Sequence, residues 1–301
     1  MRKSIWGLAA VLALSACNQD VKTETAANTP AIPAAEKQVF WGDTHLHTTN
    51  SADAFAFGAR LTPDAAYRFA KGEKVISSTG LPAQLARPLD FLVVADHGEG
   101  LGISSQILEG NPALTVDPDV AQWSRMMQEG GDSAAAAATD LINRFSAGNM
   151  PSVFIDPKIV GPIIRSVWTE QNAIADHHNT PGEFTAFIGY EFTALNMGNN
   201  LHRVVVFRDG ADKADQVMPF PATVSINPEH LWEALAAYEA KTGGQVLAIP
   251  HNGNLSNGQM FAMSDIEGNV IDTDYAQKAA RWEPLVEVTQ INGDRESHPF
   301  F

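Results

Sequence analysis

The sequence predicts an α/β fold, either an α/β barrel or an open doubly wound sheet. Short apolar runs rich in Val, Ile and Phe alternate with segments of helical pattern from residue 38 onward. The predicted helices begin at capping signals that contain proline. The chain has 301 residues, of which 45% are hydrophobic, which suits one globular domain with a large core.

The first residues have the pattern of a secretion signal. Arg2 and Lys3 precede an apolar run at 5–16, which is too short to span a membrane as a mature helix. The run ends in the letters LSAC, which resemble the lipobox of bacterial lipoproteins, and Cys17 would then be lipidated. A cleaved signal with a chance cysteine is the alternative. The lipobox predicts a periplasmic protein that is lipid-anchored to a bacterial membrane.

Three segments follow from this pattern. We expect a lipoprotein-type signal peptide at 1–17, a flexible tether rich in Ala, Thr and Pro at 18–37, and a folded domain at 38–301. The only cysteine belongs to the signal, so no internal disulfide is expected. The formal net charge of −15 argues against a nucleic-acid partner and favours a small-molecule substrate.

Six apolar runs have the length and composition of buried strands. They lie at 39–45, 90–95, 184–191, 201–207, 245–250 and 285–290.

Helices are predicted where a capping residue precedes proline at the first helical position. A run of alanines within 132–145 predicts a further helix. The capping pairs are Thr62-Pro63, Asp156-Pro157 and Asn227-Pro228.

Five of the nine histidines follow predicted strands or turns. Sites in α/β folds form beyond the carboxyl ends of strands, so these side chains should converge. Two of them form an H-x-H, and residues two apart in a strand point to the same side. One acid accompanies them, at the end of 184–191. The candidate metal ligands from this pattern are His45, His47, His97, Glu191, His202 and His251.

The position of His202 depends on a predicted hairpin. The letters MGNN between two apolar runs are a strong turn signal. A turn centred on Gly198-Asn199 pairs His202 with Leu195, four residues after Glu191. His202 and Glu191 then share a face, whereas a shift by one residue would separate them.

A shared metal site is the favoured interpretation of these residues. Packed core histidines are the alternative, but clustered imidazoles without a metal leave many polar nitrogens to satisfy. Imidazole and carboxylate ligands together suit zinc, manganese or iron. We expect His177, His178 and His230 to lie on the surface or near helix ends.

The same residues resemble the motifs of the polymerase and histidinol phosphatase (PHP) superfamily of metal-dependent hydrolases. That family opens with an H-x-H and a following acid or histidine, which match His45, His47 and Asp53, so the resemblance adds Asp53 to the candidate metal ligands. Its second motif is an Asp-His, which matches Asp96-His97. Glu191 has the expected G-x-E context, with a histidine eleven residues later. The letters GDTHLHT, RPLDFLVVADHGE, GYEFTA and VEVTQINGDRESH look most like a periplasmic PHP-like subfamily of unassigned function.

The resemblance covers roughly residues 38–301 and implies a distorted (β/α)7 TIM-like barrel that holds two or three divalent metals. The family closes its site with a late Asp-x-His, which this sequence lacks after His251. With only six strands evident, we expect a barrel that is incomplete at its C-terminal end, as in a fragment of a longer protein. A site that lost one metal position is the alternative. The late candidates, at a different spacing, are Asp294, Glu296 and His298.

The resemblance implies a metal-dependent hydrolase, in first place a phosphoesterase, that uses a metal-bound hydroxide and no side-chain nucleophile. Asp96 is expected behind the ligands, and Asn252 and Asn254 either contact substrate or form a turn. One alternative is a non-catalytic metal-binding or remnant domain, and another is a metal-dependent amide or lactone hydrolase. Contact with a membrane is expected only through the N-terminal lipid.

Overall fold

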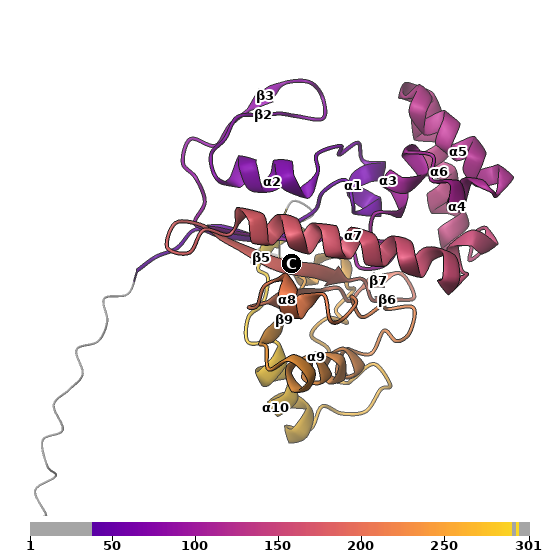
Figure 1. Ribbon diagram of the computed structural model, residues 1–301. Helices are drawn as coiled ribbons and strands as arrows, with labels where there is room; N and C mark the ends of the chain where they lie inside the picture. Colours follow the sequence, from indigo (N-terminus) through magenta and orange to yellow (C-terminus); the bar gives the residue numbers. More distant parts are fainter. Residues whose placement is uncertain (1–37, 291–292, 295–301) are drawn as a thin grey trace, which may run out of the picture. The chain divides into compact units, whose positions relative to one another are not determined.

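The computed structural model describes residues 38–290 and 293–294 (Figure 1). The chain divides into two units, Met1–Val39 and Phe40–Phe301, and the elements described below belong to the second. The predicted signal peptide, the tether and Cys17 lie outside the described residues. Among the helices that are described, none has the length and hydropathy needed to cross a membrane.

A five-stranded mixed sheet forms the centre of this unit. Its strands lie in the order β1-β4-β5-β8-β9. β1, β4 and β5 are parallel, while β8 runs antiparallel to both β5 and β9. The strands are β1 (Gly42–Leu46), β4 (Phe91–Val94), β5 (Thr185–Phe192), β8 (Arg203–Phe207) and β9 (Val246–Pro250).

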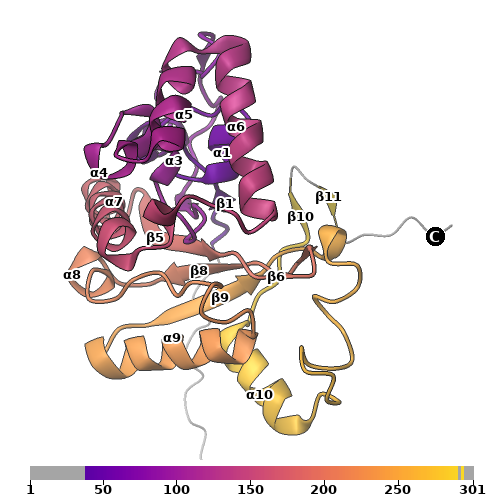
Figure 2. The same ribbon diagram turned by 90° about the vertical axis from the view of Figure 1, so that its right-hand side faces the viewer.

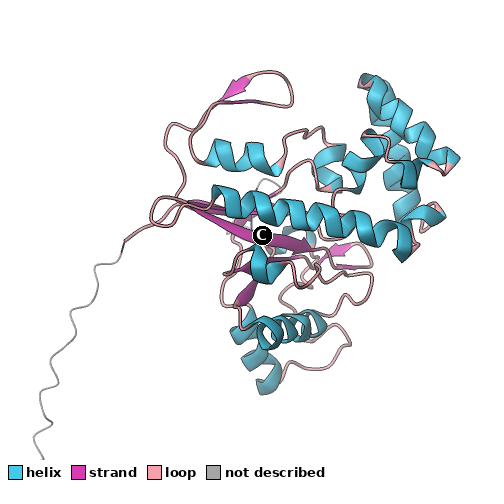
Figure 3. Ribbon diagram, in the orientation of Figure 1, coloured by secondary structure: helices cyan, strands magenta, loops and turns pink. Residues whose placement is uncertain are grey.

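The predicted (β/α)7 barrel is therefore wrong for the described part of the chain. Such a barrel needs parallel neighbours joined by helical crossovers. Here β5 returns to β8 through a hairpin, so these two strands must be antiparallel. The sheet curls into half of a barrel (Figure 3), and among the described residues no pairing joins β9 to β1.

Helices cover the outer face of the sheet and begin at the predicted capping residues. The side chain of Thr62 accepts a hydrogen bond from Ala65 N, that of Asp156 from Lys158 N, and that of Asn227 from Glu229 N. These helices pack on alternate sheet residues such as Leu92, Val94, Ile188 and Val205 in the largest core cluster. They are α2 (Pro63–Ala70), α7 (Pro157–His178) and α9 (Pro228–Thr242).

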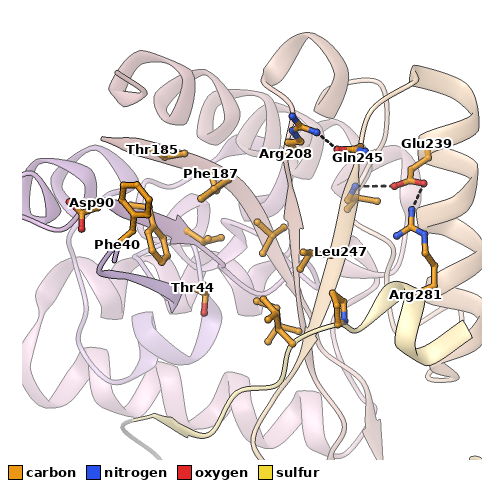
Figure 4. A pocket seen from close by; sticks show the side chains of 17 residues that line it. Phe40, Thr44, Asp90, Thr185, Phe187, Arg208, Glu239, Gln245, Leu247 and Arg281 are labelled. Carbon is orange, nitrogen blue, oxygen red and sulfur yellow. Dashed lines mark hydrogen bonds and ion pairs between the residues drawn. The ribbon is translucent and has the colours of Figure 1, made fainter. Parts of the chain in front are cut away.

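The inner face of the curled sheet is open and apolar. It lines a cavity of about 730 Å³, with Thr44, Phe187 and Leu247 pointing into it (Figure 4). At the rim, Arg208 bonds to Gln245, and Glu239 pairs with Arg281. These two faces follow from strand alternation, since successive side chains point to opposite sides.

A helical layer between β4 and η1 was not predicted in detail. Its helices gather with α1 at one end of the molecule (Figure 2). They enclose a second core in which Phe55 of α1 packs with Ile107, Leu114 and Trp123. The predicted helix at 132–145 is confirmed as α6. The elements are α1 (Ala52–Ala56), α3 (Ile103–Leu108), α4 (Pro112–Thr115), α5 (Pro118–Glu129), α6 (Gly131–Ser146) and η1 (Ser152–Phe154).

The predicted hairpin forms, but with a different centre. β6 (Leu195–Asn196) pairs with β7 (Asn199–Asn200), so the turn is centred on Met197 and Gly198. Both turn residues have positive φ, 50° and 84°, as a two-residue primed hairpin turn requires. The register continues into the main sheet, where Glu191 pairs with Val204.

The predicted sixth strand at 285–290 is wrong over most of its length. Glu287 N donates to Pro250 O, but only Thr289–Gln290 is a strand, β10, and it pairs with β11 (Gly293–Asp294). Glu296 and His298 lie outside the described residues. The remaining elements are β2 (Val75–Ile76), β3 (Pro82–Ala83), α8 (Ala211–Ala214), η2 (Gly253–Leu255) and α10 (Thr273–Trp282).

Candidate metal centre

Strand alternation brings His97, Glu191, His202 and His251 to one edge of the inner face. In β1, where Thr44 faces the cavity, the register shifts between Asp43 and Leu46, next to the H-x-H. Phe91 and Val93 face the cavity, and His97 lies on the same side beyond β4. Glu191 near the end of β5 and His251 after β9 continue the same alternation. β8 runs the other way, so His202, just before its first residue, reaches this edge too.

Gly189 lets the neighbouring strands approach closely beneath the site. A Cβ atom at this position would lie 2.5 Å from Val93 Cγ1 and 2.8 Å from Val205 O. Any side chain would therefore push β4 or β8 away from β5. The G-x-E pattern thus combines a close strand contact with a carboxylate two residues later.

Five imidazole rings form a closed circuit. The ring centroids of His45 and His47 lie 5.1 Å apart, and those of His47 and His97 lie 4.7 Å apart. The circuit continues from His97 to His202 at 5.3 Å and from His202 to His251 at 5.9 Å. His251 returns to His45 at 5.6 Å. All five predicted histidines are therefore neighbours in space.

The carboxylate of Glu191 lies within this circuit and is only 1% exposed. Its Oε1 lies 3.0 Å from His45 Nε2 and 3.2 Å from His202 Nδ1. Its Oε2 lies 3.3 Å from His47 Nε2 and 2.9 Å from His97 Nδ1. One buried acid thus faces four imidazoles.

Asp53 is the second acid and lies on the solvent side of the cluster. Its side chain is 45% exposed, and its two oxygens lie 3.4 Å from His47 Nδ1 and from His97 Nε2. It belongs to α1, whose Phe55 is buried in the core of the helical layer. The short helix therefore anchors the carboxylate through that core.

Charge pairing dominates the protonation of these groups. Burial lowers the pKa of a histidine, but the charge of Glu191 and the hydrogen bonds to Glu191 and Glu287 together outweigh it and raise the pKa of His45 to about 9. Burial also opposes the charge on His47 and His97, but pairing with the carboxylates of Asp53 and Glu191 raises the pKa of His47 to about 9 and that of His97 to about 10. Burial opposes ionisation of Glu191, yet the imidazoles hold the pKa of its carboxyl well below the usual value.

Each histidine Nδ1 has a contact with an oxygen. For His45 this is Glu287 Oε2 at 3.4 Å, for His47 Ser51 Oγ at 2.6 Å, and for His97 Thr193 Oγ1 at 2.8 Å. His251 Nδ1 lies 2.7 Å from Asn252 O, and His202 Nδ1 faces Glu191. Metal-binding histidines commonly bond one ring nitrogen to such an acceptor and offer the other to the cation.

Two buried atoms in the cluster have no hydrogen-bond partner in the described structure, His202 Nε2 and Glu191 Oε2. A buried nitrogen or carboxylate oxygen without a partner is costly, and a cation removes that cost. Three groups of side chains have the geometry to hold a metal ion. They are His45 with His47 and Glu191, His47 with Asp53 and His97, and His97 with Glu191 and His202. The donor set therefore fits divalent metal.

The other predicted site residues lie close by. Asp96 is fully buried and accepts hydrogen bonds from Thr48 N at 2.5 Å and Thr48 Oγ1 at 2.6 Å, which fixes the loop after His47. Asn252 Oδ1 accepts from Asn254 N and caps η2, a contact typical of a turn residue.

His251 completes the circuit of rings but belongs to none of the three metal-holding groups of the described residues. Its Nε2 contacts the amide of Gln290, and its Nδ1 lies 4.0 Å from Glu287 Oε2. Glu287 also accepts from Asn252 N at 3.1 Å. The segment after α10 therefore covers this side of the centre.

The histidines predicted on the surface differ from one another. His177 and His230 are exposed, as expected. His178 is the last residue of α7, as the helix-end alternative expected, but it does not lie on the surface: it is only 6% exposed, and its Nε2 lies 2.9 Å from Asp64 Oδ1. It stacks on Tyr67, which provides the burial that the sequence pattern did not indicate.

Sequence reasoning missed two hydroxyls at the centre. Ser51 Oγ contacts the ring of His47 and accepts from His97 N at 2.9 Å, so it joins the two histidine motifs. Thr193 contacts the ring of His97. Thr193 follows Glu191 by two residues, so strand alternation could have placed it on the same face.

Comparison with known proteins adds one finding. No curated protein and no solved structure matches this chain. Residues 34–301 match the model of a family described as "Protein of unknown function (DUF3604)". This match covers most of the chain, and the chain therefore belongs to that family.

Proposed function

We propose that this protein is a metal-dependent hydrolase and that its substrate is a phosphoester. The observation that carries the proposal is the closed circuit of five imidazoles around the buried Glu191. A cluster with this many ring nitrogens is costly without a cation. The resemblance to the PHP motifs supports the same class of protein.

Zinc, manganese or iron is the expected cation, because imidazole and carboxylate donors are mixed. Glu191 Oε1 faces His45 and His202 and its Oε2 faces His47 and His97, so this carboxylate could contribute to holding more than one cation. One cation would be held by His45, His47 and Glu191, and another by His97, His202 and Glu191, which are two of the groups with metal-holding geometry. The third group, which includes Asp53, offers a position nearer the solvent.

Divalent cations at this centre would supply Lewis-acid activation of water and of the scissile bond. The side chains supply orientation: Glu287, Ser51 and Thr193 hold three imidazoles by their Nδ1 atoms. Asp53, half exposed, marks the side from which water and substrate can enter. Its pKa is lowered by His47 and His97 against the effect of burial, so it remains a carboxylate near neutral pH.

The negative charge of the chain means that an anionic ester can be attracted only where cations are bound, at this centre. With a formal net charge of −15, the protein as a whole repels anions, so a local cation has to attract the substrate. Two or three divalent cations would provide that attraction and stabilise the charge that develops on phosphate oxygens.

The test begins with the metal content of the purified protein and continues with a panel of substrates. The panel contains a phosphomonoester, a phosphodiester, a carboxylic ester, an amide and a lactone, each assayed with zinc, manganese or iron. We expect bound metal and hydrolysis of at least one phosphoester. His45→Ala should lose both metal and turnover.

His177→Ala is the matched control, because His177 is exposed at the end of α7. It should keep both properties. Metal without turnover on any substrate would favour a non-catalytic metal-binding domain, and turnover of only the amide or lactone would favour the carbon-centre hydrolase. Full turnover in His45→Ala would remove the proposed centre from the reaction.

A further inference from the structure

The hydroxyl of Thr193 lies between a backbone oxygen and a ring nitrogen of the centre. Its Oγ1 donates to the backbone oxygen of Glu191 at 3.2 Å and lies 2.8 Å from His97 Nδ1. A hydroxyl has one hydrogen, and the backbone oxygen can only accept. When the hydroxyl donates to Glu191 O, Thr193 Oγ1 accepts a hydrogen from His97 Nδ1.

Thr193 is also held in place through its backbone. Its N–H donates to Glu99 Oε2 at 3.1 Å, and Glu99 Oε1 accepts from Ala222 N on a separate loop. Thr193 lies one residue beyond β5 and is partly buried. The position of its hydroxyl is thus set by the sheet on one side and by Glu99 on the other.

A second acceptor competes for the same hydrogen. Glu191 Oε2 lies 2.9 Å from His97 Nδ1, yet it forms no hydrogen bond in the described structure. With Thr193 as the acceptor, this carboxylate oxygen keeps its lone pairs. His97 Nε2, the other ring nitrogen, faces Asp53 at 3.4 Å.

We propose that Thr193 is a positioning residue of the metal centre: by accepting the Nδ1 hydrogen of His97, it leaves His97 Nε2 and Glu191 Oε2 to bind a divalent cation. This inference rests on the metal centre of the proposed function and not on the reaction assigned to it. The His97 Nδ1 hydrogen can go to Thr193 Oγ1 or to Glu191 Oε2. Only the first arrangement leaves both His97 Nε2 and Glu191 Oε2 to the metal.

Thr193→Val removes the acceptor and keeps a β-branched side chain of similar shape. His97 Nδ1–H would then turn to Glu191 Oε2, which engages a carboxylate oxygen that the cation needs. We expect zinc to bind about 10–100-fold more weakly, the usual effect of losing a residue that orients a ligand. Thr193→Ser retains the hydroxyl and should restore the affinity.

Zinc affinity is measured by competition with a chelator, starting from metal-free full-length protein. Thr115→Val is the control, because Thr115 is also partly buried and donates to a backbone oxygen, that of Asn111, outside the centre. Circular dichroism checks the fold of each variant. Equal zinc affinities of Thr193→Val and wild type would overturn the proposal.

A second readout does not depend on any variant. In zinc-loaded wild-type protein with ¹⁵N-labelled histidine, NMR identifies the ring nitrogen of His97 that carries hydrogen. We expect Nδ1, and hydrogen on Nε2 would contradict the inference. This measurement decides the question even if Thr193→Val does not fold.

The outcomes also separate this inference from the proposed function. Zinc binding with the expected His97 tautomer, but without hydrolysis of any phosphoester, would reject the function and leave the role of Thr193 intact. Hydrolysis by a protein whose Thr193→Val variant binds zinc normally would do the reverse. A wild-type chain that takes up no zinc, manganese or iron would reject both.

Discussion

His45 Nε2 and Glu191 Oε1 lie 3.0 Å apart, although their strands, β1 and β5, are separated in the sheet by β4. Each residue is the second to last of its strand, and the curvature of the sheet brings the two side chains together across β4. Glu191 makes the same kind of contact with three more imidazoles. It is thus the residue on which the proposed centre depends most.

Glu191→Gln should abolish tight metal binding. The substitution keeps the shape of the side chain but removes the charge that faces four imidazoles. We expect zinc affinity to fall by more than about 100-fold, beyond the effect of losing an orienting residue. Chelator competition measures it, with the exposed Glu183→Gln as control. Zinc affinity within a few fold of wild type would show that another group provides the central donor.

The metal-free protein should lose stability as pH rises above 6.5. The folded pKa of His45 and His47 is about 9 and that of His97 about 10, compared with 6.5 for a free histidine. The folded chain therefore binds more protons than the unfolded chain in this window. The contribution of these pairs is complete below pH 6.5 and disappears as pH passes 9 to 10.

Thermal unfolding at several pH values checks this expectation. The midpoint of the metal-free protein should fall from pH 6.5 to 9, and His97→Ala should reduce the slope. Bound metal replaces the protons, so metal affinity should rise over the same range. A midpoint that rises with pH in the metal-free protein would contradict the assigned ion pairs.

Ser51→Ala should weaken metal binding by disturbing two histidines at once. Ser51 is fully buried, contacts the ring of His47, and accepts from the backbone N–H of His97. We expect zinc affinity to fall about 10–100-fold. Ser105→Ala is the matched control, since Ser105 bonds to Thr49 O in the same loop. If both variants lost affinity equally, loop stability rather than the Ser51 contact would be responsible.

Met197→Asn should stabilise the protein. Met197 has a φ of 50° and is 88% exposed, so its side chain contributes little packing. Asn tolerates this left-handed conformation better, and Asn-Gly is a preferred pair for such turns. We expect the free energy of unfolding to rise by about 1 kcal/mol, measured by chemical denaturation. Met263→Asn, also exposed, should have no such effect; a gain there would point to surface polarity instead.

Local signals in the sequence predicted much of this structure. Proline-containing caps located the starts of three helices, because the cap residue and the proline each satisfy a specific need of the first helical turn. Apolar runs located five strands of the sheet. Six of the seven proposed ligands lie around one centre because strand ends share an edge, and Asp53 reaches the same centre from α1.

The architecture was harder to predict, because an apolar run does not indicate the direction of a strand in the sheet. A reversed β8 looks the same in sequence as a parallel strand, and only the hairpin before it indicates its direction. Residues 285–288 are also apolar enough for a strand but make only isolated backbone contacts such as Glu287 N to Pro250 O. Ser51 and Thr193 escaped attention because single hydroxyls carry no motif.

The hairpin register explains why one error did no harm. With the turn centred on Met197 and Gly198, Leu195 pairs with Asn200 instead of the expected His202, a shift of two residues. Residues two apart in a strand point to the same face, so His202 stays on the face of Glu191. A slip of this pairing by one residue would instead place His202 on the helix-covered side of the sheet, exchange it with its neighbour Arg203 and bring a guanidinium into the ring of imidazoles.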